Sequence, residues 1–216
     1  MTTEDKKAIQ FHLALIEIKI PTGQTVKSCL IAALQDARYI TGRNAQTGLP
    51  DDAVQHGYLG RWTGAMCYMT ILDQIGTCYK PKHQTRLSSG STIVKALKYF
   101  TNKLSDDEID AIYALRNAFF HDFSLYNQNP NKPKLQHTFS VGNHPTEKVV
   151  KLPQRQWDGK MSSRANDNNT FINLRTLGDL VEEIYGTLLD LDSKDELEIE
   201  LQGGPDELVN RYTMVY

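Results

Sequence analysis

Three polar side chains interrupt an apolar stretch near the middle of the 216-residue chain: Arg116, Asn117 and His121. An arginine offers a planar fork of donors that matches a phosphate, and an imidazole can exchange a proton near neutral pH. Together they could bind a phosphate group and transfer a proton beside it.

The element that must position them is a helix running from Asp106 to about Phe123. The run Ser105-Asp106-Asp107-Glu108 matches a capping box, in which the serine hydroxyl and the glutamate carboxylate each satisfy a free backbone N–H. Acidic residues in the first turn also suit the helix dipole. This is the clearest helix start in the sequence.

A helical wheel places Arg116 in the middle of an apolar stripe, whereas Asn117 and His121, four residues apart, share the flank of that stripe. A buried guanidinium is costly unless it meets a carboxylate, a phosphate or water. The helix therefore presents its polar side chains at a border between core and cleft. The apolar stripe consists of Ile109, Ile112, Phe119, Phe120 and Phe123.

A purely structural reading of the same residues stays open. Asp73 lies on an apolar stripe of a long helix predicted over about 52–79, and it could pair with Arg116. His121 could cap free carbonyls at the end of its own helix. On the opposite face of the long helix, Gly57, Gly60 and Gly64 indicate that another helix or a second subunit approaches closely.

The segment Leu115-Arg116-Asn117-Ala118-Phe119-Phe120-His121 resembles the R-N-x-x-x-H signature of the HEPN superfamily. The resemblance implies a mainly α fold, a bundle of four or five helices, and a homodimer whose signature helices meet at a metal-independent endoribonuclease site. Arg116 would contact the scissile phosphate, Asn117 would hydrogen-bond within the site, and His121 would act as general acid or base. Asp73 would support Arg116. No cofactor and no metal are expected.

One departure from the family pattern concerns regulation. Toxin-type members often carry a tyrosine, a modification site, two residues after the histidine, but this chain has Phe123 there. Regulation by modification at that position is therefore doubtful, and Tyr126 lies too far along the chain to replace it.

The predicted organisation places the resemblance over residues 25–126 and a final core helix at 175–193. Around these we expect an N-terminal strand or extension at 1–24, for which strand and helix both fit part of the pattern. Two strands around a Gly142-Asn143 turn should form a small β-rich insert near 134–174, within 127–174. The acidic residues 194–216 should form a weakly ordered tail.

Charge is distributed unevenly along the chain. Residues 80–103 carry six basic side chains and no acidic one, whereas residues 179–207 carry eleven carboxylates and one lysine. The net charge of only −2 argues against a general nucleic-acid coat protein, yet it can hide a basic face beside an acidic one. A functional basic patch and two solvated faces are both consistent with this pattern.

The remaining features point to an intracellular protein. Three cysteines without a C-x-x-C pair argue against a disulfide framework, and no stretch reads as a signal peptide or a membrane span. We expect the protein to be cytoplasmic. The family resemblance implies RNA as a partner and a role in toxin–antitoxin or defence biology, with a separate antitoxin or regulatory protein as a further partner. The rival hypotheses are a catalytically inactive HEPN-like binding or structural module and an unrelated helical bundle.

Overall fold

The computed structural model describes residues 2–51, 59–87, 90–143 and 148–215, without the side chains of residues 59–61. It is 52% helical and 16% strand, and the described residues form seven α-helices and three sheets with nine strands in total. The fold is therefore mixed α/β, and the prediction of a mainly α bundle of four or five helices is wrong.

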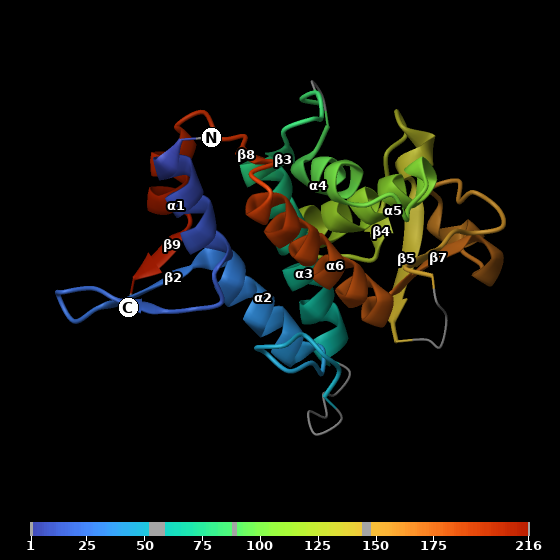
Figure 1. The fold of residues 1–216 in the computed structure, drawn as a ribbon. Helices are drawn as coiled ribbons and strands as arrows, with labels where there is room; N and C mark the ends of the chain where they lie inside the picture. The colour runs from blue at the N-terminus through green and yellow to red at the C-terminus, as the bar shows by residue number, and fades with distance from the viewer. Residues whose placement is uncertain (1, 52–58, 88–89, 144–147, 216) are drawn as a thin grey trace.

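The helices surround α3, which runs through the middle of the molecule (Figure 1). Helices α2, α4 and α6 all pack against α3, and their inward faces belong to one continuous apolar core. The helices are α1 (Thr3–Leu13), α2 (Cys29–Ile40), α3 (Leu59–Cys78), α4 (Thr92–Phe100), α5 (Asp106–Asn117), α6 (Leu174–Ser193) and α7 (Gly204–Arg211).

Short strands tie distant parts of the chain together in three sheets. The sheet orders are β1-β2-β9, β3-β8 and β4-β5-β7-β6, and every pairing is antiparallel except that of β5 with β7. The strands are β1 (Ile18–Lys19), β2 (Thr25–Ser28), β3 (Tyr79–Pro81), β4 (Tyr126–Asn127), β5 (His137–Gly142), β6 (Val150–Lys151), β7 (Asn169–Asn173), β8 (Leu197–Ile199) and β9 (Thr213–Val215).

Glycines on α3 mark close helix contacts. A Cβ at Gly64 would lie 2.4 Å from a methyl group of Thr41, so the expected close neighbour on that face is the end of α2. The tightest crossing is at Gly76, for which no role was predicted: a Cβ there would lie 1.8 Å from the carbonyl oxygen of Thr92 on α4. Gly57 lies outside the described residues, and the surroundings of Gly60 are not described.

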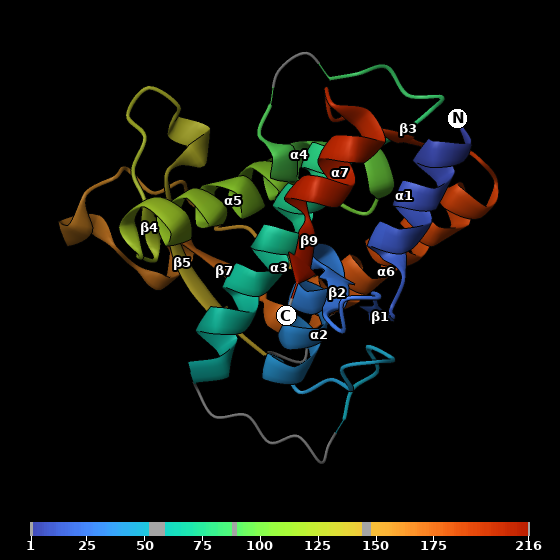
Figure 2. The same ribbon diagram turned by 90° about the vertical axis from the view of Figure 1, so that its left-hand side faces the viewer.

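The acidic C-terminal segment is ordered, contrary to the expectation of a weakly ordered tail. It forms β8, α7 and β9, and Leu197 and Leu208 are fully buried. Figure 2 shows α7 and β9 lying beside the N-terminal elements α1 and β2. Apolar residues between the carboxylates are buried in the core. The prediction of a tail considered only the net charge of the segment and so overlooked them.

The β-rich insert exists, but its topology differs from the predicted hairpin. Strand β7 lies between β5 and β6, in parallel register with β5 and antiparallel to β6. The strands on either side of the expected turn at Gly142 therefore do not pair with each other. Strands β4 and β6 have only two residues each, which is too short for an alternating pattern to show in the sequence.

The N-terminal ambiguity resolves into both alternatives in succession. Residues 3–13 form α1, which Thr2 and Asp5 begin with a capping box, and residues 18–19 form β1. The next helix, expected from Thr25, begins at Cys29 because Thr25–Ser28 pair with β1 and β9 as β2. The long helix expected from residue 52 is α3, described from Leu59 onward.

Among the described helices, none combines the length and the apolar character that crossing a membrane requires.

Candidate functional site

The predicted capping box opens α5 as expected. The Glu108 carboxylate accepts from the Ser105 backbone N–H at 2.8 Å, and the Ser105 hydroxyl accepts from the Glu108 N–H at 3.3 Å. The helix continues in α geometry to Asn117, which places Arg116 and Asn117 in its last turn. The start of the signature helix is therefore confirmed.

Arg116 is anchored by Asp73 from α3, as the sequence suggested. Its Nε donates to Asp73 Oδ2 at 2.8 Å, and the two side chains keep 26% and 18% of their exposure. The pair is half-buried at a helix–helix border rather than enclosed in the core. Asp73 engages the guanidinium only through Nε, and Nη1 faces Asn117 and His121.

The second oxygen of Asp73 caps α4, a role that the sequence did not predict. It accepts from the Thr92 hydroxyl at 2.5 Å and from the Ile93 backbone N–H at 3.1 Å. Ser91 occupies the N-cap position but makes no side-chain capping bond. Asp73 therefore joins α3, α4 and α5 at one point.

Arg116, Asn117 and His121 converge. Nη1 of Arg116 lies 3.5 Å from Asn117 Oδ1 and 3.5 Å from His121 Nε2. These contacts are longer than strong hydrogen bonds, as is common for catalytic groups before a substrate draws them together. His121 is exposed, and among the described residues its ring donates no bond to a helix carbonyl, so the C-cap interpretation has no support there.

The last part of the signature helix departs from α geometry. Residues Ala118–Asp122 form a π-helical turn, and Phe123 follows with a left-handed backbone, φ 48°. The wider turn changes the direction of the side chains within and after it, so Phe120 is 40% exposed and Phe123 is 67% exposed. The prediction that both phenylalanines face the core is wrong, because the wheel assumed 3.6 residues per turn throughout.

Aromatic rings surround the polar residues. The guanidinium of Arg116 lies 5.3 Å from the centre of the Phe120 ring, within the range of a cation–π contact. Trp62 of α3 packs against the buried Phe119, with ring centres 4.7 Å apart, and against the exposed Phe123 at 5.5 Å. The site therefore combines a cation, an imidazole and accessible aromatic surface.

The two oppositely charged runs meet in the fold. Lys80 pairs with Glu198 where β3 lies beside β8, and Arg86 and Lys95 both bind Glu200. Further along, Lys103 pairs with Glu183. The basic residues 80–103 are thus largely compensated by the acidic run, and neither a free basic patch nor two separate solvated faces describes them.

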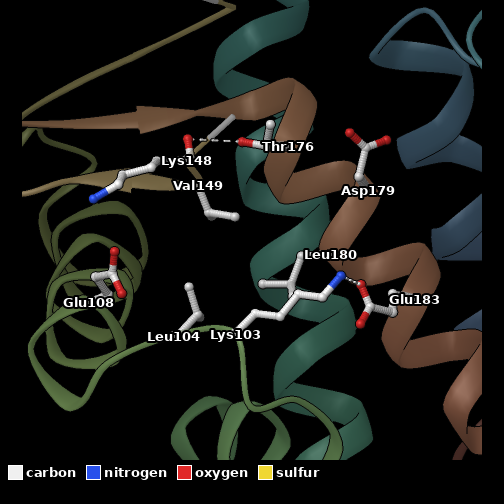
Figure 3. Close-up of a pocket in the computed structure, with 9 residues that line it drawn as sticks. All are labelled: Lys103, Leu104, Glu108, Lys148, Val149, Thr176, Asp179, Leu180 and Glu183. Carbon is white, nitrogen blue, oxygen red and sulfur yellow. Dashed lines mark hydrogen bonds and ion pairs between the residues drawn. The ribbon is translucent and has the colours of Figure 1, made fainter. Parts of the chain in front are cut away.

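A cavity of about 460 Å³ lies between the start of α5, the two residues before β6 and the first half of α6. Figure 3 shows Lys103 crossing it to Glu183, and Thr176 donating to the Lys148 carbonyl. Asp179 on its rim is already paired with Arg43, and Glu108 with the Ser105 cap. The charged lining is used to hold the elements together, so the cavity adds no residue to the candidate site.

The other histidines have structural settings or fall outside the described residues. His137 is buried between Thr170 and the Lys134 carbonyl, and burial lowers its pKa. His83 is exposed, and positions 56 and 144 are not described. No group of three or more His, Cys, Asp or Glu side chains in the described ranges is arranged to hold a metal ion.

The settings of His12 and Phe123 were also not predicted from the sequence. His12 of α1 is buried against Tyr79, with Nδ1 2.6 Å from the hydroxyl oxygen, and burial lowers its pKa to about 4. The Phe123 position could have been noticed, because a helix commonly ends with glycine in the left-handed conformation and here a phenylalanine stands in its place.

Comparison with protein-family models, with curated proteins and with solved structures finds no match. The family resemblance therefore rests on the motif Arg116 to His121, and the case for function rests on the geometry of the site.

Proposed function

We propose that this protein is a metal-independent endoribonuclease of the HEPN type, with a composite site where two copies of α5 meet in a homodimer. The carrying observation is the convergence of Arg116, Asn117 and His121 at the exposed end of α5, with Asp73 holding the guanidinium by its Nε edge. The proposal concerns the site and not a helical-bundle fold, which the structure does not have.

The chemistry assigned to each residue follows from its donors and acceptors. Nε2 of His121 accepts the proton of the ribose 2′-hydroxyl as the 2′-oxygen attacks phosphorus. Arg116 Nη1 and Nη2 bind the phosphate oxygens and stabilise the charge that develops on them. The bond from phosphorus to the 5′-oxygen breaks, the 5′-oxygen takes a proton, and a 2′,3′-cyclic phosphate remains.

A second copy would complete this sequence of proton transfers. A single imidazole cannot accept the 2′ proton and donate to the 5′-oxygen at the same moment. Two copies of His121 across a two-fold axis would divide the roles of base and acid. Asn117, beside Nη1 of Arg116, would orient the guanidinium or the substrate.

By the same resemblance we propose a cytoplasmic protein in toxin–antitoxin or defence biology, opposed by a separate antitoxin or regulatory protein.

Cleavage of structured and single-stranded RNA in the presence of EDTA tests the proposal. Wild-type protein should cut, and His121→Ala should abolish cutting without changing the thermal melt, because the imidazole is exposed. His83→Ala removes another exposed histidine and is the matched control, which should cut like the wild type. Intact RNA with folded wild-type protein under every condition, or equal cutting by His121→Ala, would refute the nuclease.

A second candidate is a catalytically inactive binding or structural module, favoured by one specific observation. Asp73 holds Arg116, Thr92 and the Ile93 N–H together, so the ion pair has a bracing role whether or not catalysis occurs. The module predicts that removing Asp73 destabilises the protein and that no RNA is cut. A two-fold dimer in which the copies of His121 lie far apart would also favour the module.

A further inference from the structure

Two phenylalanines beside the proposed catalytic residues are exposed in a way that folding alone does not explain. Phe123 keeps 67% of its surface and Phe120 keeps 40%. Phe120 lies within a π-helical turn and Phe123 directly follows it, and such turns are often found at functional sites. Leaving large apolar side chains in water forgoes the stabilisation that burial would give.

The backbone of Phe123 adds a second cost. Its φ of 48° lies in the left-handed region, which is unfavourable for a bulky residue and which glycine adopts freely. Since the position after a helix is commonly glycine, a phenylalanine here is destabilising both by conformation and by exposure. Such an outlier indicates a function for the side chain.

Trp62 fixes the Phe123 ring from behind. The two ring centres lie 5.5 Å apart, and Trp62 is itself packed on the buried Phe119 at 4.7 Å. The two rings are inclined at 56°, so Trp62 supports the Phe123 ring from one side while 67% of the residue's surface stays exposed. A rigid aromatic ring held in this way loses little entropy when a flat ligand stacks on it.

Charge complementarity identifies the ligand. Arg116 lies over Phe120 at 5.3 Å, and Asp73 occupies only its Nε edge, so a cation borders the aromatic surface. His121 and Phe123 are two residues apart, so their Cα atoms lie within about 7.6 Å of each other, the limit for two peptide steps. Arg116 Nη1 lies 3.5 Å from His121 Nε2, so a ligand that reaches from the guanidinium past the imidazole to the Phe123 ring is anionic at one end and planar at the other.

We propose that Phe123, supported by Trp62, is a stacking surface for an unpaired base next to the phosphate held by Arg116. The substrate class is then single-stranded RNA, because a base inside a duplex is already stacked on its neighbours and presents no free face. Aromatic side chains read single strands in this way in many proteins. The inference deepens the proposed ribonuclease function and rests on it.

An exposed apolar surface such as that of Phe120 and Phe123 could instead be covered by a second copy of the chain. A purely apolar partner surface would leave the outer guanidinium nitrogens of Arg116 desolvated without an acceptor, which is costly. A nucleotide supplies both the flat apolar face and the acceptor oxygens. The surface therefore fits a base within the cleft better than a closed protein contact.

Binding measurements in the His121→Ala background test the stacking surface without cleavage. Dissociation constants are compared for a short single-stranded RNA and for a blunt duplex of the same sequence. Phe123→Leu should weaken single-strand binding by about fivefold to a hundredfold, the usual effect of losing one stacked base, and should leave duplex binding unchanged. Phe123→Tyr should bind the single strand like the parent.

Two further variants control for folding and for nonspecific apolar loss. Phe123→Gly relieves the left-handed strain, so it should fold and still bind the single strand as weakly as Phe123→Leu. Tyr39→Leu removes an exposed aromatic ring on α2 and should bind like the parent. Equal binding by parent, Leu and Gly variants at position 123 would overturn the stacking surface.

The experiment separates the failure of this inference from that of the nuclease. Cutting that depends on His121 with binding indifferent to position 123 overturns the stacking surface alone. Single-strand binding that depends on position 123 without any cutting by the wild type supports the surface and refutes the nuclease. If Phe123→Leu turns a dimer into a monomer in sedimentation and binding falls only as the dimer dissociates, the ring belongs to a subunit interface and the inference is overturned.

Discussion

Asp73 serves two neighbours with its two oxygens. Oδ2 holds the Arg116 guanidinium, while Oδ1 accepts from Thr92 and Ile93 at the start of α4. The carboxylate thereby fixes the arginine relative to the helix packed beside it. A catalytic arginine gains from such support because its side chain is otherwise flexible.

Replacing Asp73 should separate these contributions. Asp73→Ala removes both the cap and the ion pair, and we expect the free energy of unfolding to fall by about 1–3 kcal/mol, since a lost cap costs about 1 kcal/mol and a half-exposed pair adds less than a buried one. Asp73→Asn keeps an oxygen for the Ile93 N–H and should lose less. Urea denaturation measures both, with exposed Asp107→Ala, expected within about 0.5 kcal/mol of wild type, as control. Equal stability of all variants would contradict the bracing role.

The sequence predicted the part of the site that follows from an α-helical period. Arg116 on an apolar stripe required a partner, and Asp73 on the facing stripe was the partner found. The capping of α4 by that carboxylate was not predictable, because it depends on how α3 crosses α4. Phe120 and Phe123 were assigned to the core because nothing in their spacing announces a π-helical turn.

At the level of elements, the crossing of α3 and α4 determines where Asp73 lies. Gly76 stands where the helices come closest, one turn along the helix from Asp73, and its missing side chain lets the Thr92 carbonyl approach. The sequence had linked glycines on this helix with close packing, but at Gly57, Gly60 and Gly64. The spacing of glycines alone did not show which one lies at the closest contact.

Two separate glycine-to-alanine substitutions test the packing of α3 against α4. Gly76→Ala would place a methyl group 1.8 Å from the Thr92 carbonyl oxygen, so the helices must separate, and we expect a loss of at least about 3 kcal/mol in the free energy of unfolding. Gly186→Ala on α6 meets no atom within 4 Å and should instead stabilise by about 0.5–1 kcal/mol, the helix-propensity gain. Thermal and urea unfolding of both variants give the comparison. A Gly76→Ala protein as stable as wild type would show that α4 does not pack as described.

Helix α1 is docked through a neutral histidine, which gives the fold a pH dependence. His12 is in contact with the Tyr79 hydroxyl, the Gln74 amide and the Tyr212 ring, and burial lowers its pKa from 6.5 to about 4. Burial also raises the pKa of Tyr79 and of Tyr212, so both rings stay neutral while His12 titrates. Protonating His12 would therefore place an uncompensated charge under α1.

Acid should weaken the fold through this group. Between pH 6.5 and about 4 the unfolded chain binds the His12 proton and the folded chain does not, so stability is full above that window and falls as the pH drops through it. The whole difference corresponds to about 3 kcal/mol. His12→Gln, which cannot titrate, should show a shallower slope of unfolding free energy against pH over this window. Parallel slopes for wild type and variant would exclude His12 as the cause.

For the whole molecule, the two charged runs that looked like separate faces are joined by ion pairs. Glu200, with its side chain 2% exposed, binds Arg86 and Lys95, and Glu198 binds Lys80 across the β3–β8 pair. A sequence shows how much charge each run carries but not that the two runs meet. The β3–β8 pairing and these ion pairs hold the first part of the C-terminal segment in place.

Two truncations test whether the C-terminal segment belongs to the core. Ending the chain after Tyr212 removes β9, whose Met214 and Val215 are exposed. The melting temperature should therefore fall by less than about 5 °C, and amide exchange should quicken in β2, the strand that β9 pairs with.

Ending the chain after Glu196 also removes the fully buried Leu197 and Leu208 and uncovers the face of α1 against which α7 packs. That shorter chain should lose its cooperative melt, since deleting two buried leucines and a packed helix removes a large share of an ordinary protein's net stability. Calorimetry and hydrogen exchange on both truncated proteins measure these effects. A cooperative melt near the wild-type temperature after the longer deletion would show that the acidic segment is not part of the folded core.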